Sequence, residues 1–245
     1  MIIAGKSDIG LVRVNNEDNY IIVNNQDDNT LMLVCDGIGG SKAGEIASLT
    51  AIKFMAHAFS HTTNFTTVIS AKLWLEKNLR LANDEVALFA EQNLEYEGMG
   101  TTLVGAMIFN QYTIIINIGD SRAYILKDNT LKQVTQDHSL VNELLNNGQI
   151  TSDEIDFHPQ RNVLTNALGI ASNVRIDLLE VNQYDTLLLC SDGLSGYVSE
   201  SIIERILNQV GNVEVHLNQL IQVAHEAGGY DNITVILAER GGAYE

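Results

Sequence analysis

The sequence predicts an α+β fold in which antiparallel sheets are covered by helices. Residues 102–109 and 112–118 are both strand-like and are separated only by Asn110-Gln111, which is typical of a hairpin. Long helical stretches occur as two blocks, residues 43–95 and 199–227, whereas strand-like runs are scattered along the chain. A parallel sheet requires regular alternation of strand and helix, so antiparallel sheets with helices on their faces are favoured.

The remaining elements follow from short local patterns. Runs of β-branched and apolar residues predict strands at residues 19–23, 30–35, 122–127, 186–190 and 233–238. Apolar residues at helical spacing predict helices through residues 46–59, through residues 140–145 ahead of Gly148, and through residues 217–224 ahead of Gly228-Gly229. Ser201 and Glu204 have the spacing of a capping box, which predicts a helix that opens there and ends near Gly211.

The composition narrows the class of protein. Its 31 acidic and 14 basic side chains give a formal charge of −17, which argues against a nucleic-acid backbone or an anionic membrane as partner. A single proline and the lack of a Gly/Ser-rich linker indicate one domain over residues 1–245. We find no secretory signal and no apolar run of the ~18 residues that a membrane span needs. Cys35 and Cys190 lie in apolar runs, as reduced thiols do, so we expect a cytoplasmic protein.

Two apolar strands end in the same dipeptide. Residues 31–37 read Leu-Met-Leu-Val-Cys-Asp-Gly, and residues 187–193 read Leu-Leu-Leu-Cys-Ser-Asp-Gly. One Asp-Gly after a strand commonly marks a turn. An aspartate at the end of a buried strand is also held by rigid backbone, and the glycine lets a ligand approach the chain closely. The repetition favours a ligand site over two unrelated turns.

Acidic residues recur in such settings, at Glu17-Asp18, Asp36, Asp120, Asp192 and Asp231. Most carboxylates of so acidic a chain are expected to solubilise its surface. Carboxylate oxygens are, however, the ligands that Mg²⁺ and Mn²⁺ prefer, and no histidine lies in a metal-binding pattern. Two such ions about 3.5–4 Å apart can share a hydroxide that attacks phosphorus near neutral pH. The pattern therefore predicts Mn²⁺ or Mg²⁺ rather than zinc.

Six short motifs occur in order along the chain, and five of them contain these acidic residues. They are Arg13-Val-Asn-Asn-Glu17-Asp18, Val34-Cys-Asp36-Gly37-Ile-Gly39-Gly40, Gly100-Thr101-Thr102, Gly119-Asp120-Ser121-Arg122, Ser191-Asp192-Gly193 and Asp231-Asn232. Each motif is weak alone. Together they resemble the metal-dependent protein phosphatase family, type 2C, in its compact bacterial form. The resemblance runs from Ser7 to about Ala238 and so covers nearly the whole chain.

The resemblance implies both a fold and an activity. The fold is a four-layer αββα sandwich, with two antiparallel sheets flanked by helices and a flap over residues 136–170 beside the site. The activity is hydrolysis of phosphoserine and phosphothreonine in proteins by a hydroxide that bridges two divalent cations. A bacterial serine/threonine kinase is the implied counterpart. No cysteine or serine has an activating base in its sequence context, so no covalent intermediate is expected.

The resemblance also implies roles for the acidic residues. Asp36 would bridge both cations, and the Gly37 carbonyl would bind the second. Asp192 and Asp231 would complete the shell of the first cation, and Asp120 with Asp192 matches a third site seen in bacterial members. Glu17 and Asp18 would act through cation-bound waters or hydrogen bonds to the ligands, and Asn232 would orient Asp231.

Three residues are candidates for contact with substrate. The resemblance assigns the phosphate to Arg13, and a guanidinium fork suits phosphate oxygens. The alternative for Arg13 is a salt bridge with Glu17 on the same segment. His158 and Arg161 lie in the flap and could touch substrate, but a structural role for either is equally open.

One position departs from many eukaryotic members of the family. Ile38 stands where those members have a histidine that can protonate the leaving group. Two proton donors therefore remain open, water on a cation held by Asp120 and Asp192, or His158. Two rival functions also remain, a pseudophosphatase that binds phosphoproteins without turnover and an esterase for small phosphorylated molecules.

Overall fold

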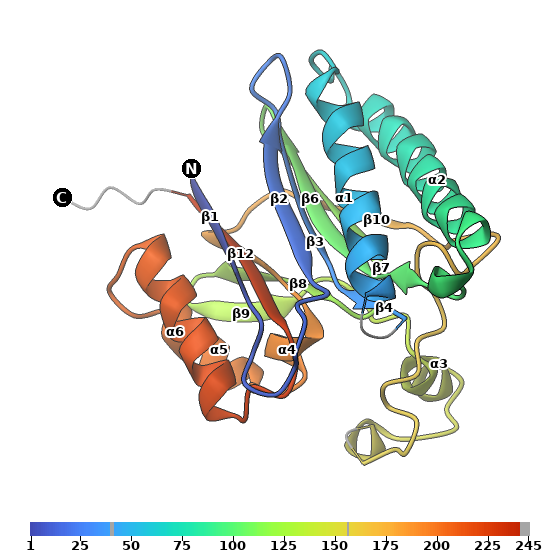
Figure 1. Ribbon diagram of the computed structural model, residues 1–245. Helices are drawn as coiled ribbons and strands as arrows, with labels where there is room; N and C mark the ends of the chain where they lie inside the picture. Colours follow the sequence, from blue (N-terminus) through green and yellow to red (C-terminus); the bar gives the residue numbers. More distant parts are fainter. Residues whose placement is uncertain (40–41, 156, 241–245) are drawn as a thin grey trace.

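The computed structural model describes residues 1–39, 42–155 and 157–240 (Figure 1). Gly40 of the Asp36-Gly37 motif lies outside the described residues. In these ranges no helix is both long and apolar enough to cross a membrane.

Two five-stranded sheets form the centre of the molecule, and every neighbouring pair of strands is antiparallel. One sheet has the order β1 (Ile2–Asp8), β12 (Ile233–Glu239), β11 (Thr186–Cys190), β8 (Arg122–Lys127) and β9 (Thr130–Gln133). The other has the order β10 (Asp177–Val181), β7 (Tyr112–Ile118), β6 (Leu103–Phe109), β3 (Thr30–Cys35) and β2 (Asn19–Asn24). A short pair, β4 (Gly37–Ile38) and β5 (Gly100–Thr101), continues from β3. The predicted antiparallel sheets are confirmed.

Helices cover the outer face of each sheet (Figure 1). The long helices α1 (Ala43–Ser60) and α2 (Val68–Gln92) pack on the sheet that contains β3. The helices α5 (Glu200–Leu207) and α6 (Val213–Glu226) pack on the sheet that contains β12. Shorter pieces are α3 (Leu140–Asn146), α4 (Asp192–Ser195) and 3₁₀ turns at Leu94–Tyr96 and Ser152–Glu154. These are the four αββα layers that the resemblance implied.

Strand β3 shows why the central strands read as unbroken apolar runs. Its side chains alternate, so Leu31 and Leu33 pack toward α1 and α2, whereas Met32 and Val34 pack between the two sheets. Both faces are buried, and all four side chains are fully buried. A strand in the middle of a sandwich with helices outside therefore has no polar face.

The hairpin prediction and the central strands are confirmed. Phe109 pairs with Tyr112 across Asn110-Gln111, and Asn110 has φ = 50°, as tight turns require. Within the two five-stranded sheets, three strands were not predicted, β1, β9 and β10, and each lies at the edge of its sheet; the two-residue strands β4 and β5 were not predicted either. Edge strands are half-exposed and carry polar residues, so their sequences lack a clear strand pattern.

The prediction of a capping box at Ser201 is wrong. The helix starts one residue earlier, at Glu200 after Ser199, and ends at Leu207 rather than near Gly211. The Glu204 carboxylate accepts a hydrogen bond from the Leu131 amide of strand β9 at 2.7 Å. With Ser199 as the N-cap, the third helical residue is Ile202, so Glu204 lies too far along the helix to complete a capping box.

Candidate active site

The antiparallel arrangement gathers the acidic residues at one end of the sandwich. Strands β2 and β3 are paired, so Asp18, which precedes β2, lies beside Asp36, which follows β3. Strands β11 and β12 are paired, so Asp192, which follows β11, lies near Asp231, which precedes β12. Asp120 follows the end of β7 in the same region.

Two threonines hold the main chain of Asp36. The Asp36 amide donates to Thr102 Oγ1 at 3.0 Å, and the Thr102 amide donates to the Asp36 carbonyl at 2.9 Å. Thr101 Oγ1 donates to the same carbonyl at 2.9 Å. Thr102 Oγ1 also lies 2.7 Å from Ser121 Oγ, beside Asp120. The carboxyl of Asp36 is therefore presented by a backbone that is bonded on both sides.

Asp18 is buried beneath this cluster. Ser191 Oγ donates to Asp18 Oδ2 at 2.6 Å. Burial raises the pKa of Asp18 to about 7; bonds from Ser191 and Thr234 oppose the rise, and the charges of Asp192 and Asp231 add to it. A carboxyl with this pKa is only partly ionised near neutral pH, and a nearby positive charge would favour its ionised form.

The other carboxyls of the cluster share this behaviour. Burial, followed by the charges of Asp18, Asp192 and Asp120, raises the pKa of Asp36 well above its ordinary value. Burial and the charge of Asp192 raise the pKa of Asp120 to about 7. Burial and the charge of Asp231 raise the pKa of Asp192. Arg13 and Arg122 act to lower the pKa of Asp192, but burial and the charge of Asp231 outweigh them.

This donor set fits hard divalent cations. Asp192 Oδ1 is buried and has no hydrogen-bond partner among the described residues. The carboxyls of Asp36 and Asp192 lie close enough for each to shift the pKa of the other. Across the described ranges, no three His, Cys, Asp or Glu side chains converge into a finished ligand set. A cation here would therefore take ligands from carbonyls and water as well as from carboxylates.

Arg13 stands at the rim of the cluster. Its Nη2 donates to Asp231 Oδ2 at 2.7 Å, and its side chain is 49% exposed. The salt bridge with Glu17, which was the alternative role for Arg13, is not the ion pair observed, since the partner is Asp231. The guanidinium lies next to the acidic cluster and is still open to solvent, as a contact for an incoming anion must be.

Asn232 fastens the segment that carries Arg13. Its Oδ1 accepts from the Glu17 amide at 2.8 Å, and its Nδ2 donates to the carbonyls of Ile9 and Asn15, both at 2.9 Å. Contact with Asp231 is made by the Asn232 main-chain amide, which donates to Asp231 Oδ1 at 2.9 Å. The side chain thus orients the Arg13 segment, and the main chain orients Asp231.

A cavity of about 800 Å³ adjoins the acidic cluster and reaches under the flap segment, residues 136–170. Its lining includes Asp120, Asp192 and, from the flap segment, Arg161. The other flap candidate, His158, is not among the lining residues; its Nδ1 accepts from the Gln160 amide at 3.2 Å. The structure brings Arg161, but not His158, to the carboxylates.

The hydroxyl residues around the site were missed as functional positions. Thr102, Ser121 and Ser191 are fully or almost fully buried, and each bonds to a cluster aspartate or to a neighbour of one. Each lies inside one of the six motifs, and Ser121 and Ser191 directly adjoin Asp120 and Asp192, so this placement was the available signal.

The sandwich with its buried acidic end defines a known class of hydrolase. The model for Protein phosphatase 2C matches residues 12–236, and the chain belongs to this family. As a member, it is a protein phosphatase.

Relatives agree over nearly the full length. The chain is 41% identical over 237 residues to serine/threonine phosphatase stp of Listeria welshimeri, covering 96% of this chain and 94% of the relative. It is 37% identical over 235 residues to protein phosphatase PhpP of Streptococcus pneumoniae, covering 94% of each. The crystal structure of serine/threonine phosphatase Stp1 from Staphylococcus aureus superposes with a TM-score of 0.92 at 41% identity, covering 98% of this chain and 95% of that one.

Proposed function

We propose that this chain hydrolyses phosphoserine and phosphothreonine in proteins, with two or three Mn²⁺ or Mg²⁺ ions at its acidic site. The observation that carries the proposal is the cluster of Asp18, Asp36, Asp120 and Asp192, whose pKa values are all raised. Bound cations would supply a water that is acidic enough to attack phosphorus near neutral pH. The names of the relatives given above support a phosphoprotein as substrate.

Each residue of the site is assigned a role in cation binding. We assign the bridging ligand to Asp36, the second-cation carbonyl to Gly37, and the remaining ligands of the first cation to Asp192 and Asp231. A third cation would lie between Asp120 and Asp192, which line the same cavity. We assign Glu17 and Asp18 to waters and hydrogen bonds around the ligands, because Asp18 already accepts from Ser191.

Delivery of a proton to the leaving alkoxide is assigned to water held at Asp120 and Asp192. A serine or threonine alkoxide is strongly basic and needs a proton as it departs. Both aspartates line the cavity, whereas His158 is not among its lining residues. Arg161 lines the cavity as well and is assigned to the substrate.

We place the protein in the cytoplasm, opposite a serine/threonine kinase. Cys35 and Cys190 are buried free thiols, as expected in a reducing compartment. The formal charge of −17 disfavours binding to nucleic acid or anionic lipid.

The function is tested by comparing three substrates in the presence of Mn²⁺: a phosphothreonine peptide, a nucleoside monophosphate and para-nitrophenyl phosphate. Of the phosphothreonine peptide and the nucleoside monophosphate, the peptide should show the higher kcat/KM. A preference for the nucleotide would support the small-molecule esterase. Binding of the phosphopeptide without turnover of any substrate would support the pseudophosphatase.

Arg13→Ala is expected to lower kcat/KM for the phosphopeptide by about 10- to 150-fold. A charge-assisted contact with phosphate is worth roughly 1.5–3 kcal/mol, which corresponds to that factor. Arg13→Lys should recover only part of it, because an ammonium lacks the fork. Arg80→Ala is the matched control, since Arg80 is 46% exposed in an ion pair with Glu76 on α2. Equal kcat/KM values for Arg13→Ala and wild type would leave Arg13 as a surface ion pair only.

A further inference from the structure

His138 lies at the base of the flap segment and is built into the loop that carries Asp120. Its side chain is 1% exposed. Its amide donates to the Gly119 carbonyl at 2.9 Å, and its carbonyl accepts from the Thr165 amide at 2.9 Å. The main chain of His138 therefore links Gly119, the residue before Asp120, to Thr165 near the end of the flap segment.

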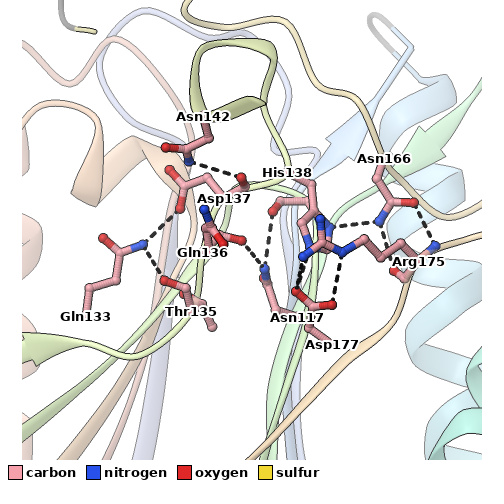
Figure 2. Close-up of polar contacts among 11 residues, drawn as sticks. Asn117, Gln133, Thr135, Gln136, Asp137, His138, Asn142, Asn166, Arg175 and Asp177 are labelled. Atoms are coloured by element: carbon pink, nitrogen blue, oxygen red, sulfur yellow. Dashed lines mark hydrogen bonds and ion pairs between the residues drawn. The ribbon is translucent and has the colours of Figure 1, made fainter. Parts of the chain in front are cut away.

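The hydrogen bonds of the ring determine its tautomer (Figure 2). Nδ1 lies 3.1 Å from the Gly119 amide and 2.9 Å from Asn166 Nδ2. The Asn166 amide is oriented by Arg175, whose main-chain N–H donates to Asn166 Oδ1 at 3.0 Å and whose carbonyl accepts from Asn166 Nδ2 at 2.9 Å. Both groups that face Nδ1 can only donate, so Nδ1 carries no proton and the ring proton is on Nε2.

Asp177 holds the ring from the other side. His138 Nε2 donates to Asp177 Oδ2 at 3.0 Å, and Arg175 donates to both oxygens of the same carboxylate, at 3.1 and 2.9 Å (Figure 2). Burial acts to raise the pKa of Asp177, but the bonds from Arg175 and His138 outweigh it, and the pKa is lowered. Asp177 therefore remains an acceptor for Nε2–H, and this acceptor keeps the lone pair at Nδ1.

The Gly119 peptide depends on such an outside support. Gly119 has φ = 104°, and a Cβ at this position would lie 2.7 Å from Thr102 Cγ2. The residue can therefore carry no side chain of its own to fix the turn. His138 bonds to both its amide and its carbonyl, whereas Asn117 Nδ2 contacts the carbonyl alone, at 3.5 Å.

We propose that His138, as the Nε2–H tautomer, is a positioning residue for Asp120 and couples that carboxylate to the flap segment. It holds the peptide immediately before Asp120 and bonds, through Asn166 and the Thr165 amide, to the returning end of the flap segment. The inference rests on the proposed role of Asp120 as a cation ligand. Its expected consequence is that the protein binds the cation at Asp120 more weakly when the Nδ1 acceptor is lost.

Two isosteric variants separate the two sides of the ring. In His138→Asn the side-chain oxygen takes the place of Nδ1 and can accept from Gly119 and Asn166, but the bond to Asp177 is lost. In His138→Gln the amide reaches Asp177, but no acceptor faces Gly119. Loss of a group that orients a ligand typically weakens metal binding by about 10- to 100-fold. We expect that loss for His138→Gln and a change of less than about threefold for His138→Asn.

The measurement is calorimetric titration with Mn²⁺, and Asp120→Ala identifies the binding step that belongs to Asp120. His216→Gln is the matched control. His216 lies on α6, away from the site, its side chain is 4% exposed, and its Nδ1 lies 2.7 Å from Glu239 Oε1. His216→Gln should leave Mn²⁺ binding unchanged whatever it does to Tm. Wild-type Mn²⁺ affinity in His138→Gln, or equal losses in both His138 variants, would overturn the positioning role.

A second measurement does not depend on how the variants fold. The long-range ¹H–¹⁵N spectrum of the wild-type protein should show the His138 ring protonated at Nε2 alone. A ring protonated at Nδ1 would contradict the proposal. If no Mn²⁺ binding step is lost in Asp120→Ala, the proposed role of Asp120 fails, whereas the NMR result still decides the tautomer.

Discussion

Asp36→Asn is expected to lower kcat by about three orders of magnitude or more while the protein stays folded. The change removes the charge and one of the two oxygens of a carboxylate that we assign to both cations, and about 4 kcal/mol of lost transition-state stabilisation corresponds to a thousandfold. Steady-state kinetics on a phosphothreonine peptide at saturating Mn²⁺ measures the loss. Retention of a tenth of wild-type turnover would show that Asp36 does not bridge.

The same variant has an opposite effect on the metal-free protein. Ionising Asp36 in the folded protein is unfavourable because its charge is repelled by Asp18, Asp192 and Asp120. Asp36→Asn should therefore raise the Tm in chelator and reduce the increase in Tm that Mn²⁺ produces. Asp27→Asn, in the exposed turn before β3, is the control and should change neither.

Removal of divalent cations should abolish activity and make stability depend on pH. Asp18 and Asp120 have pKa values of about 7 in the folded chain, above the ordinary value of 3.8. The folded state therefore binds more protons than the unfolded state between those values, so metal-free stability falls as pH rises through that interval. Below that interval both carboxyls are protonated in the folded and the unfolded state, so the stabilisation that comes from their raised pKa values is fully present.

Bound Mn²⁺ or Mg²⁺ should reverse this trend, because the cation stabilises the ionised carboxyls. Tm in EDTA should be lower at about pH 8 than at about pH 5, and added Mn²⁺ should raise Tm most at the higher pH. The same samples should regain phosphatase activity with Mn²⁺ or Mg²⁺. Full activity after exhaustive dialysis against EDTA would falsify the metal-dependent mechanism.

The acidic residues could be found from sequence because each ends a buried strand or lies next to one. Asp36 and Asp192 follow apolar runs that have no polar face, and such runs are recognisable without a structure. The antiparallel class followed from the short turn at Asn110-Gln111. Both signals are local in the chain.

The supports of the site could not be found in this way because they join distant segments. Ser191 bonds to Asp18 across 173 positions, and Asn232 bonds to the Glu17 amide across 215 positions. The alternative considered for Arg13, a salt bridge with Glu17, named the wrong partner for the same reason. Glu17 is its neighbour in sequence, whereas Asp231 is its neighbour in space. Local patterns contain no information about such pairings until the sheet order is known.

The ends of the sandwich differ in how much rearrangement of the chain they can accept. The described non-glycine residues with positive φ are Asp28, Asn110, Asp128 and Asn129, and all lie in hairpin turns at the end opposite the carboxylates. Ile2 and Glu239 are paired at that end as well. Loop insertions, affinity tags or a linker that joins β12 to β1 in a circularly permuted chain would be built there. Such changes would leave every carboxylate in its present place.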